Sequence, residues 1–109
     1  MAWLVAEDRV VASLEIADTA STRRRGLLGR RGIEGALLLR PARSVHTVRM
    51  QFAIDVAHID ADMVVLSVVT MRPGRLGRWR RRAHCVIEAE AGSLRRWGVE
   101  PGVQIEVRV

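Results

Sequence analysis

Short apolar segments recur along almost the whole chain, and several alternate strictly between apolar and polar residues. The alternation is clearest over residues 9–17 and 103–109. A period of two is typical of a β-strand with one buried face, whereas a helix requires apolar residues every three or four positions. Aromatic residues make up only 4% of the chain, so a core must be built mainly from Val, Leu, Ile and Ala. These constraints favour a strand-rich fold.

The same reasoning predicts the other strands and two hairpins. Residues 2–6 pair with 9–17 across a turn at Glu7-Asp8, and residues 53–60 pair with 63–71 across Asp60-Ala61-Asp62. Because 63–71 is apolar on both faces, we expect it at the centre of the sheet. Further short strands are predicted at 35–39, 44–48 and 83–89.

One main helix is predicted over residues 19–31. Thr19 or Ser21 can serve as its N-cap, and Gly29 or Gly32 can end it. Gly26 inside this helix is unfavourable by about 1 kcal/mol relative to alanine, which indicates a close backbone contact there. A single helical turn is predicted near 93–97, where Gly98 follows.

Together these elements predict an α+β fold in one domain spanning residues 1–109, with a mostly antiparallel sheet curled toward a barrel. No signal peptide and no apolar run of the roughly 18 residues needed to span a membrane is present, so we expect a cytoplasmic protein that is a monomer or a weak homo-oligomer. Cys85 is the only cysteine, which excludes an intrachain disulfide.

Four motifs occur in a characteristic order. These are Arg23-x-x-Gly26-Leu27-Leu28-x-Arg30, Gly35-Ala-Leu-Leu-Leu39, His46-Thr47-Val48-Arg49-Met50-x-Phe52-x-Ile54-Asp55-Val56, and Glu88-x-x-Ala91-Gly92 with the later Gly98 and Gly102. The series, over roughly residues 10 to 107, resembles the uncharacterised domain of unknown function 192 (DUF192) family. Val48-Arg49 stands where one branch of that family has Phe-Gly, and Ala53 stands where proline is usual. The resemblance implies a small β-rich fold and no assigned activity.

Charged residues inside apolar segments are candidates for a site. Arg23 shares the apolar face of the predicted helix, and Asp55 and Glu88 lie within apolar strands. A buried charge is tolerated mainly when it is paired. We therefore expect Arg23 or Arg30 to pair with Asp55 or Glu88, either as a structural salt bridge or as part of a pocket in which an arginine binds an anionic ligand.

His46 and Thr47 form a second candidate, because an imidazole beside a hydroxyl can support proton transfer or anion binding. The alternative is a histidine with satisfied hydrogen bonds in the core. His58, His84 and Cys85 raise the question of a metal, but His84 and Cys85 are adjacent and point to opposite faces of a strand. No zinc-type spacing exists, so we predict no metal and no cofactor.

The segment 72–82 carries six arginines, and the whole chain has a net charge of +6. Such a loop can bind phosphates nonspecifically while Trp79 stacks on a base. The alternative is a solvated loop in a chain whose basic residues are all arginine, as a GC-rich genome would produce. The candidate residues of this loop are Arg72, Arg75, Arg78, Trp79, Arg80, Arg81 and Arg82.

Three functions follow from these candidates. The leading hypothesis is a non-enzymatic binding or accessory module, whose partner is a protein or a small anionic ligand. The second is nonspecific binding of nucleic acid or another anion through residues 72–82. The third is an enzyme that acts on a small anionic substrate, with His46 as the base and Arg23 or Arg30 holding the substrate.

Overall fold

Seven strands and two short helices make up the computed structural model, which describes residues 1–109. None of its helices is long and apolar enough to cross a bilayer. In chain order the elements are β1 (Ala2–Ala6), β2 (Arg9–Ala17), α1 (Ala20–Arg25), β3 (Ala36–Leu39), β4 (Ile54–Ile59), β5 (Val65–Met71), β6 (Cys85–Glu90), α2 (Ser93–Arg96) and β7 (Ile105–Arg108).

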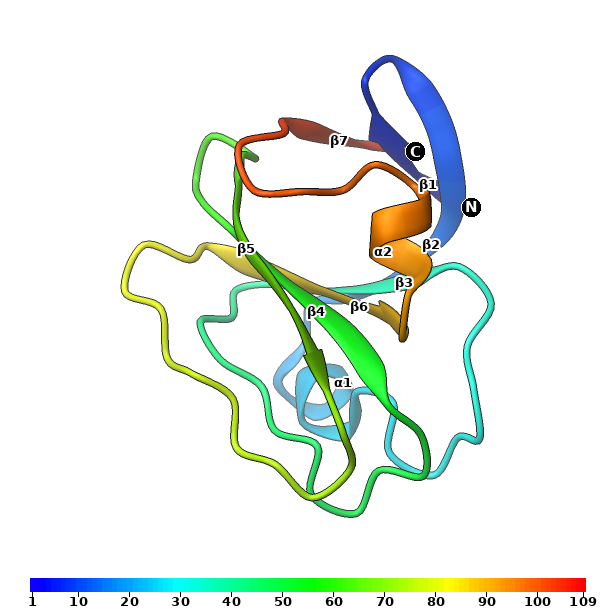
Figure 1. Ribbon diagram of the computed structural model, residues 1–109, viewed down its shortest axis with the longest axis vertical. Helices are drawn as coiled ribbons and strands as arrows, with labels where there is room; N and C mark the ends of the chain where they lie inside the picture. Colours follow the sequence, from blue (N-terminus) through cyan, green and yellow to red (C-terminus); the bar gives the residue numbers. More distant parts are fainter.

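All the strands form one curled sheet, in the order β5-β4-β6-β3-β2-β1-β7 (Figure 1). Only the β2–β3 pair is parallel, and it is joined by the crossover that contains α1. The curl brings the two ends of the sheet together, because the amide of Ile105 donates to the carbonyl of Met63 and that of Val65 to the carbonyl of Val103. The predicted α+β fold with a curled, mostly antiparallel sheet is therefore confirmed.

Each face of the sheet has its own core. The larger cluster contains Leu4, Leu38 and Ile87 together with Leu94 of α2. The smaller cluster lies on the opposite face and contains Leu37, Val56 and Val86 together with Leu27, just after α1. The two helices accordingly lie on opposite sides of the central strands (Figure 1). The face that carries the smaller core is the one on which a cavity opens.

The main helix is much shorter than predicted. Thr19, one of the two predicted N-caps, caps the helix and forms a capping box with Thr22, but the helix ends at Arg25. Gly26 adopts φ 49 and ψ −125, which lies outside the helical region and which glycine reaches most easily. Residues 27–30 then form hydrogen-bonded turns, so Arg30 is not helical. The glycine marks a helix end rather than a close contact within a helix.

Two strand predictions were wrong. Residues 44–48 form no strand, and only an isolated bridge joins His46 to Leu76. Their backbone groups bond to the 72–82 loop instead of the sheet, through pairs such as Gly77 to Val45. The strand over 65–71 lies at the end of the sheet order rather than at its centre. It is apolar on both faces because Val65 packs into the larger core and Met71 into the smaller one.

Candidate functional site

The predicted polar cluster is divided between the two faces of the sheet. Asp55 of β4 stands opposite Ala89 of β6, and its neighbour Val56 stands opposite Glu88. Successive side chains of a strand point to opposite faces. Asp55 therefore faces α2, whereas Glu88 faces the smaller core and α1. The two carboxyl groups cannot belong to one site.

Asp55 has a structural role. It is 2% exposed, and its carboxylate accepts hydrogen bonds from the Thr70 hydroxyl at 2.8 Å and from the Gly92 and Leu94 amides at 2.9 and 3.2 Å. These bonds attach the start of α2 to the sheet. A hollow of about 470 Å³ adjoins Asp55, but both carboxylate oxygens are already engaged. We therefore place no ligand there.

The arginines pair with other partners than expected. Arg23 donates to the carbonyl oxygens of Asp18 and Arg40, at 3.1 and 3.3 Å. Arg30 forms a bidentate ion pair with Glu15 at 2.8 and 3.0 Å, and this contact lowers the pKa of Glu15. The predicted pairing of Arg23 or Arg30 with Asp55 or Glu88 was thus wrong. For Arg23 the prediction failed because backbone carbonyl oxygens already occupy its guanidinium. For Arg30 it failed because the chain leaves the helical path after Gly26.

Glu88 is the one carboxyl group of the predicted set that lacks a partner. It is 4% exposed, and neither of the two ion pairs in the protein involves it. Burial alone raises its pKa to about 7. An ideal Cβ built on Gly26 would lie 3.6 Å from its Oε1 atom, so the carboxyl group lies directly beneath the glycine that ends α1. A largely buried acid with a raised pKa beside a cavity is a common mark of a functional site.

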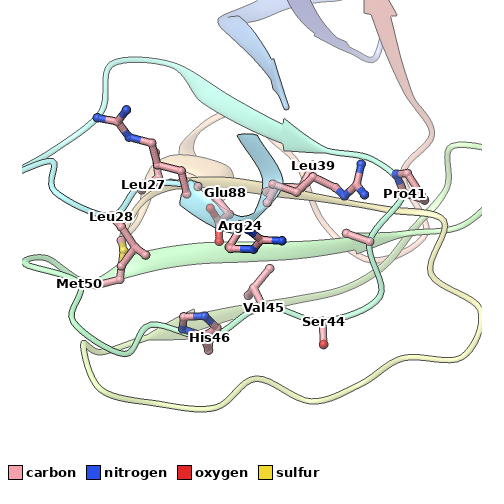
Figure 2. Close-up of a pocket in the computed structure, with 14 residues that line it drawn as sticks. Arg24, Leu27, Leu28, Leu39, Pro41, Ser44, Val45, His46, Met50 and Glu88 are labelled. Carbon is pink, nitrogen blue, oxygen red and sulfur yellow. The ribbon is translucent and has the colours of Figure 1, made fainter. Parts of the chain in front are cut away.

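A cavity of about 310 Å³ opens above this carboxyl group. It lies between the end of α1 and the segment 41–50, and Figure 2 shows Glu88 at its centre. The apolar wall comes from both segments and from β3, through Leu27, Leu28, Leu39, Pro41, Ala42, Val45 and Met50. The polar lining consists of Arg23, Arg24, Arg25, Ser44, His46 and Glu88.

The polar side chains around the cavity differ in whether they already have hydrogen-bond or ion-pair partners in the protein. The guanidinium of Arg23 is already bonded to backbone carbonyls, whereas Arg24 and Arg25 are exposed and form no ion pair. His46 is exposed at the lining, with its backbone bridged to Leu76. The arrangement offers an acceptor or weak acid at the floor and two free cations at the mouth. The sequence reasoning missed Arg24 and Arg25, although their place beside Arg23 in a run of three was a visible signal.

Thr47 lies outside the cavity and joins two loops. It is fully buried, and its hydroxyl donates to the carbonyl of Arg72 at 2.6 Å and accepts from the amide of Arg75 at 2.8 Å. A third bond connects the Gly74 amide to the Thr47 carbonyl. Thr47 therefore fixes the 72–82 loop against the segment that lines the cavity.

The 72–82 loop displays most of its arginines on the surface. Arg72, Arg75, Arg78, Arg81 and Arg82 are exposed, while Arg80 is half-buried. Trp79 is 59% exposed, and the guanidinium of Arg43 lies 5.8 Å from its ring centre. Leu76 is 82% exposed. The loop thus combines cations with large apolar side chains that the rest of the chain does not cover.

The histidines and the cysteine do not converge. His84 is exposed and Cys85 is buried, and burial raises the pKa of the Cys85 thiol to about 11. His58 is 2% exposed, and burial and the nearby Arg80 lower its pKa. No group of three or more His, Cys, Asp or Glu side chains could hold a metal ion. Cys85 is a core residue, as the sequence suggested.

Comparisons with known proteins agree with the fold. A family described as "Uncharacterized ACR", DUF192, matches residues 3–107. A search of curated proteins gave no match. A crystal structure of a protein of unknown function from Novosphingobium aromaticivorans is similar with a TM-score of 0.81 and 17% identity, over 96% of this chain and 82% of that one. A protein from Sinorhizobium meliloti, provisionally named a transcription regulator, has a TM-score of 0.80 and 21% identity, over 97% and 91% of the two chains. The family match covers nearly the whole sequence, and the chain belongs to the DUF192 family.

Proposed function

We propose that the protein is a non-enzymatic module that binds a small molecule in the cavity above Glu88. One observation carries the proposal: the carboxyl group of Glu88 is 4% exposed, has no partner in the protein and lies at the floor of a cavity of about 310 Å³. The Glu88 carboxyl group lines the cavity and no side chain or backbone group of the protein is bonded to it, so a ligand can hydrogen-bond to it without displacing a protein partner. The lining combines apolar side chains with polar groups, as small-molecule sites do.

Binding is favoured over catalysis by the state of His46. A histidine that acts as a base is normally oriented by a hydrogen bond to its second ring nitrogen. The His46 side chain is exposed, and no hydrogen bond joins its ring to a carboxylate. Asp55 is on the other face of the sheet, and Glu88 lines the same cavity without bonding to the ring. Glu88 is therefore the residue around which the proposal is built, with His46 as part of the lining.

The test uses variants that fill or spare the cavity. Ser44 lines the cavity and is exposed, so Ser44→Trp places a large ring over it. Ser21→Trp introduces the same ring on an exposed position of α1 that does not line the cavity, and serves as the matched control. A library of neutral, cationic and anionic fragments is screened by amide chemical shifts in ¹⁵N–¹H spectra.

We expect fragments to shift the amides of Leu28, Val45 and Met50 in the parent protein and in Ser21→Trp, but not in Ser44→Trp. If no fragment moves these amides, or if the shifts persist in Ser44→Trp, the cavity is not a binding site and the proposal is wrong.

A second candidate function is nonspecific binding of single-stranded nucleic acid to the 72–82 loop. The observation that favours it is the exposed Trp79 ring among exposed arginines, because a base can stack on an aromatic ring while cations neutralise phosphates. Such binding weakens steeply with salt, since counterions are released.

The matched pair of variants for this candidate keeps the net charge equal. The test variant changes Arg75, Arg78 and Arg81 of the loop to Ser. The control variant changes three exposed arginines outside the loop, Arg9, Arg31 and Arg95, to Ser. Fluorescent single-stranded DNA is titrated at about 50 and about 200 mM salt, where loss of three phosphate contacts reduces the slope of log K against log salt by about 2. Equal weakening by both variants would show that net charge alone governs binding.

A further inference from the structure

The carboxyl group of Glu88, at the floor of the cavity, favours a positively charged group on the ligand. When Glu88 ionises, its carboxylate is largely withdrawn from water and has no ion-pair partner in the protein. A charge-assisted hydrogen bond from an ammonium group is roughly twice as strong as one from a neutral donor. An ammonium group also neutralises the buried charge, which a hydroxyl group cannot do.

The exposed arginines at the mouth of the cavity favour a negatively charged group on the ligand. Arg24 and Arg25 are exposed, form no ion pair and line the same cavity as Glu88. A simple amine would bind Glu88 but would be repelled by these two cations, and a simple acid would meet Glu88 at the floor. A ligand that carries both charges matches both ends.

The wall between these ends is apolar, with Leu27, Leu28 and Met50 on one side of Glu88 and Leu39 on the other (Figure 2). Burying methylene groups against such a wall contributes roughly 0.8 kcal/mol for each one removed from water. We infer that the ligand is a small zwitterion, in which an ammonium group bound to Glu88 and an acid group bound to Arg24 and Arg25 are joined by a short apolar segment. This inference rests on the proposed small-molecule function and specifies its ligand class.

The experiment compares three probes of nearly equal length. These are ε-aminocaproate, which carries both charges, n-hexylamine, which carries only the positive one, and caproate, which carries only the negative one. Each is titrated at pH 7.5 and followed through the amide shifts of Leu28, Val45 and Met50. Glu88→Gln removes the floor charge, and the exposed Glu90→Gln on the same strand is its matched control. Arg24→Ser with Arg25→Ser removes the mouth charges, with the exposed Arg95→Ser and Arg96→Ser on α2 as control.

The zwitterion is expected to bind at least about tenfold more tightly than either singly charged probe, equivalent to about 1.4 kcal/mol. This preference should disappear in Glu88→Gln and in the Arg24, Arg25 variant and persist in both controls. If n-hexylamine or caproate binds as tightly as ε-aminocaproate, the cavity binds small molecules but the ligand class is wrong. If none of the three probes moves the cavity amides, the ligand class is also wrong, and the fragment screen with Ser44→Trp decides separately whether the cavity binds any small molecule.

Discussion

Replacing Glu88 by glutamine should stabilise the protein in a strongly pH-dependent way. The buried carboxyl group has its pKa raised from the ordinary 4.5 to about 7. The unfolded chain therefore loses this proton at a lower pH than the folded protein does. Well below pH 4.5 both states hold the proton and no difference arises. As the pH rises toward and beyond 7, the folded protein loses stability relative to the unfolded chain.

The magnitude follows from the size of this difference. Each unit of pKa difference is worth about 1.4 kcal/mol, so the ionised Glu88 destabilises the fold by roughly 3 kcal/mol at pH 8. The Glu88→Gln side chain is neutral at every pH and has nearly the same shape. We expect the variant to match the parent near pH 4.5 and to exceed its free energy of unfolding by about that amount at pH 8.

Urea denaturation followed by circular dichroism at pH 4.5, 6 and 8 measures the difference between variant and parent. Taking the difference removes the contributions of other titrating groups, including His58. Glu90→Gln, at an exposed position of the same strand, should show no such trend. A stability difference that stays constant from pH 4.5 to pH 8 would refute the conclusion that Glu88 is buried without a partner.

Three other perturbations test separate parts of the structure. Asp55→Ala leaves the buried amide of Leu94 and the amide of Gly92 without their acceptor, so the free energy of unfolding should fall by at least about 2 kcal/mol in urea titrations, while probe shifts at the Glu88 cavity persist. Gly77→Ala would force its new Cβ against the backbone carbonyl of Val45, so hydrogen exchange of the amide at position 77 should accelerate, with a loss of about 1–3 kcal/mol in stability. Burial lowers the pKa of His58, so the parent should lose stability relative to His58→Gln as the pH falls below about 6.5. If urea titrations gave the two proteins the same pH dependence, His58 would not be buried as a neutral ring.

Local patterns in the sequence predicted the strands well because strand alternation needs only neighbouring residues. The hairpin of β1 and β2 and the pairing of β4 with β5 follow from alternation and turn residues. The end of α1 was missed, because the sequence allows Gly26 either a helical or a left-handed backbone, and only the surrounding packing selects one.

The candidate site was predicted only in part, because the sequence does not determine the register in which β4 pairs with β6. Glu88 and Asp55 were both recognised as misplaced charges, but the pairing of β4 with β6 decides which face each one occupies. A shift of one residue would place Asp55 opposite Glu88 and both carboxyl groups on one face, and no local pattern determines this register. The cavity itself depends on the 41–50 segment, which was predicted to be partly a strand and instead packs beside the 72–82 loop.

Because the two cores lie on opposite faces of the sheet, the protein should tolerate substitutions better around the cavity than in the larger core. The larger core joins α2 to strands at both ends of the sheet, so substitutions there disturb the whole fold. The cavity lies on the other face, and most of its lining comes from the end of α1 and from segment 41–50, outside the strands. Substitutions in these two segments can therefore alter the cavity while the larger core is preserved. Leu27, Leu39 and Met50 belong both to this lining and to the smaller core. Changes at these positions therefore cost stability, whereas changes at the exposed Ser44 and His46 can reshape the cavity without disturbing either core.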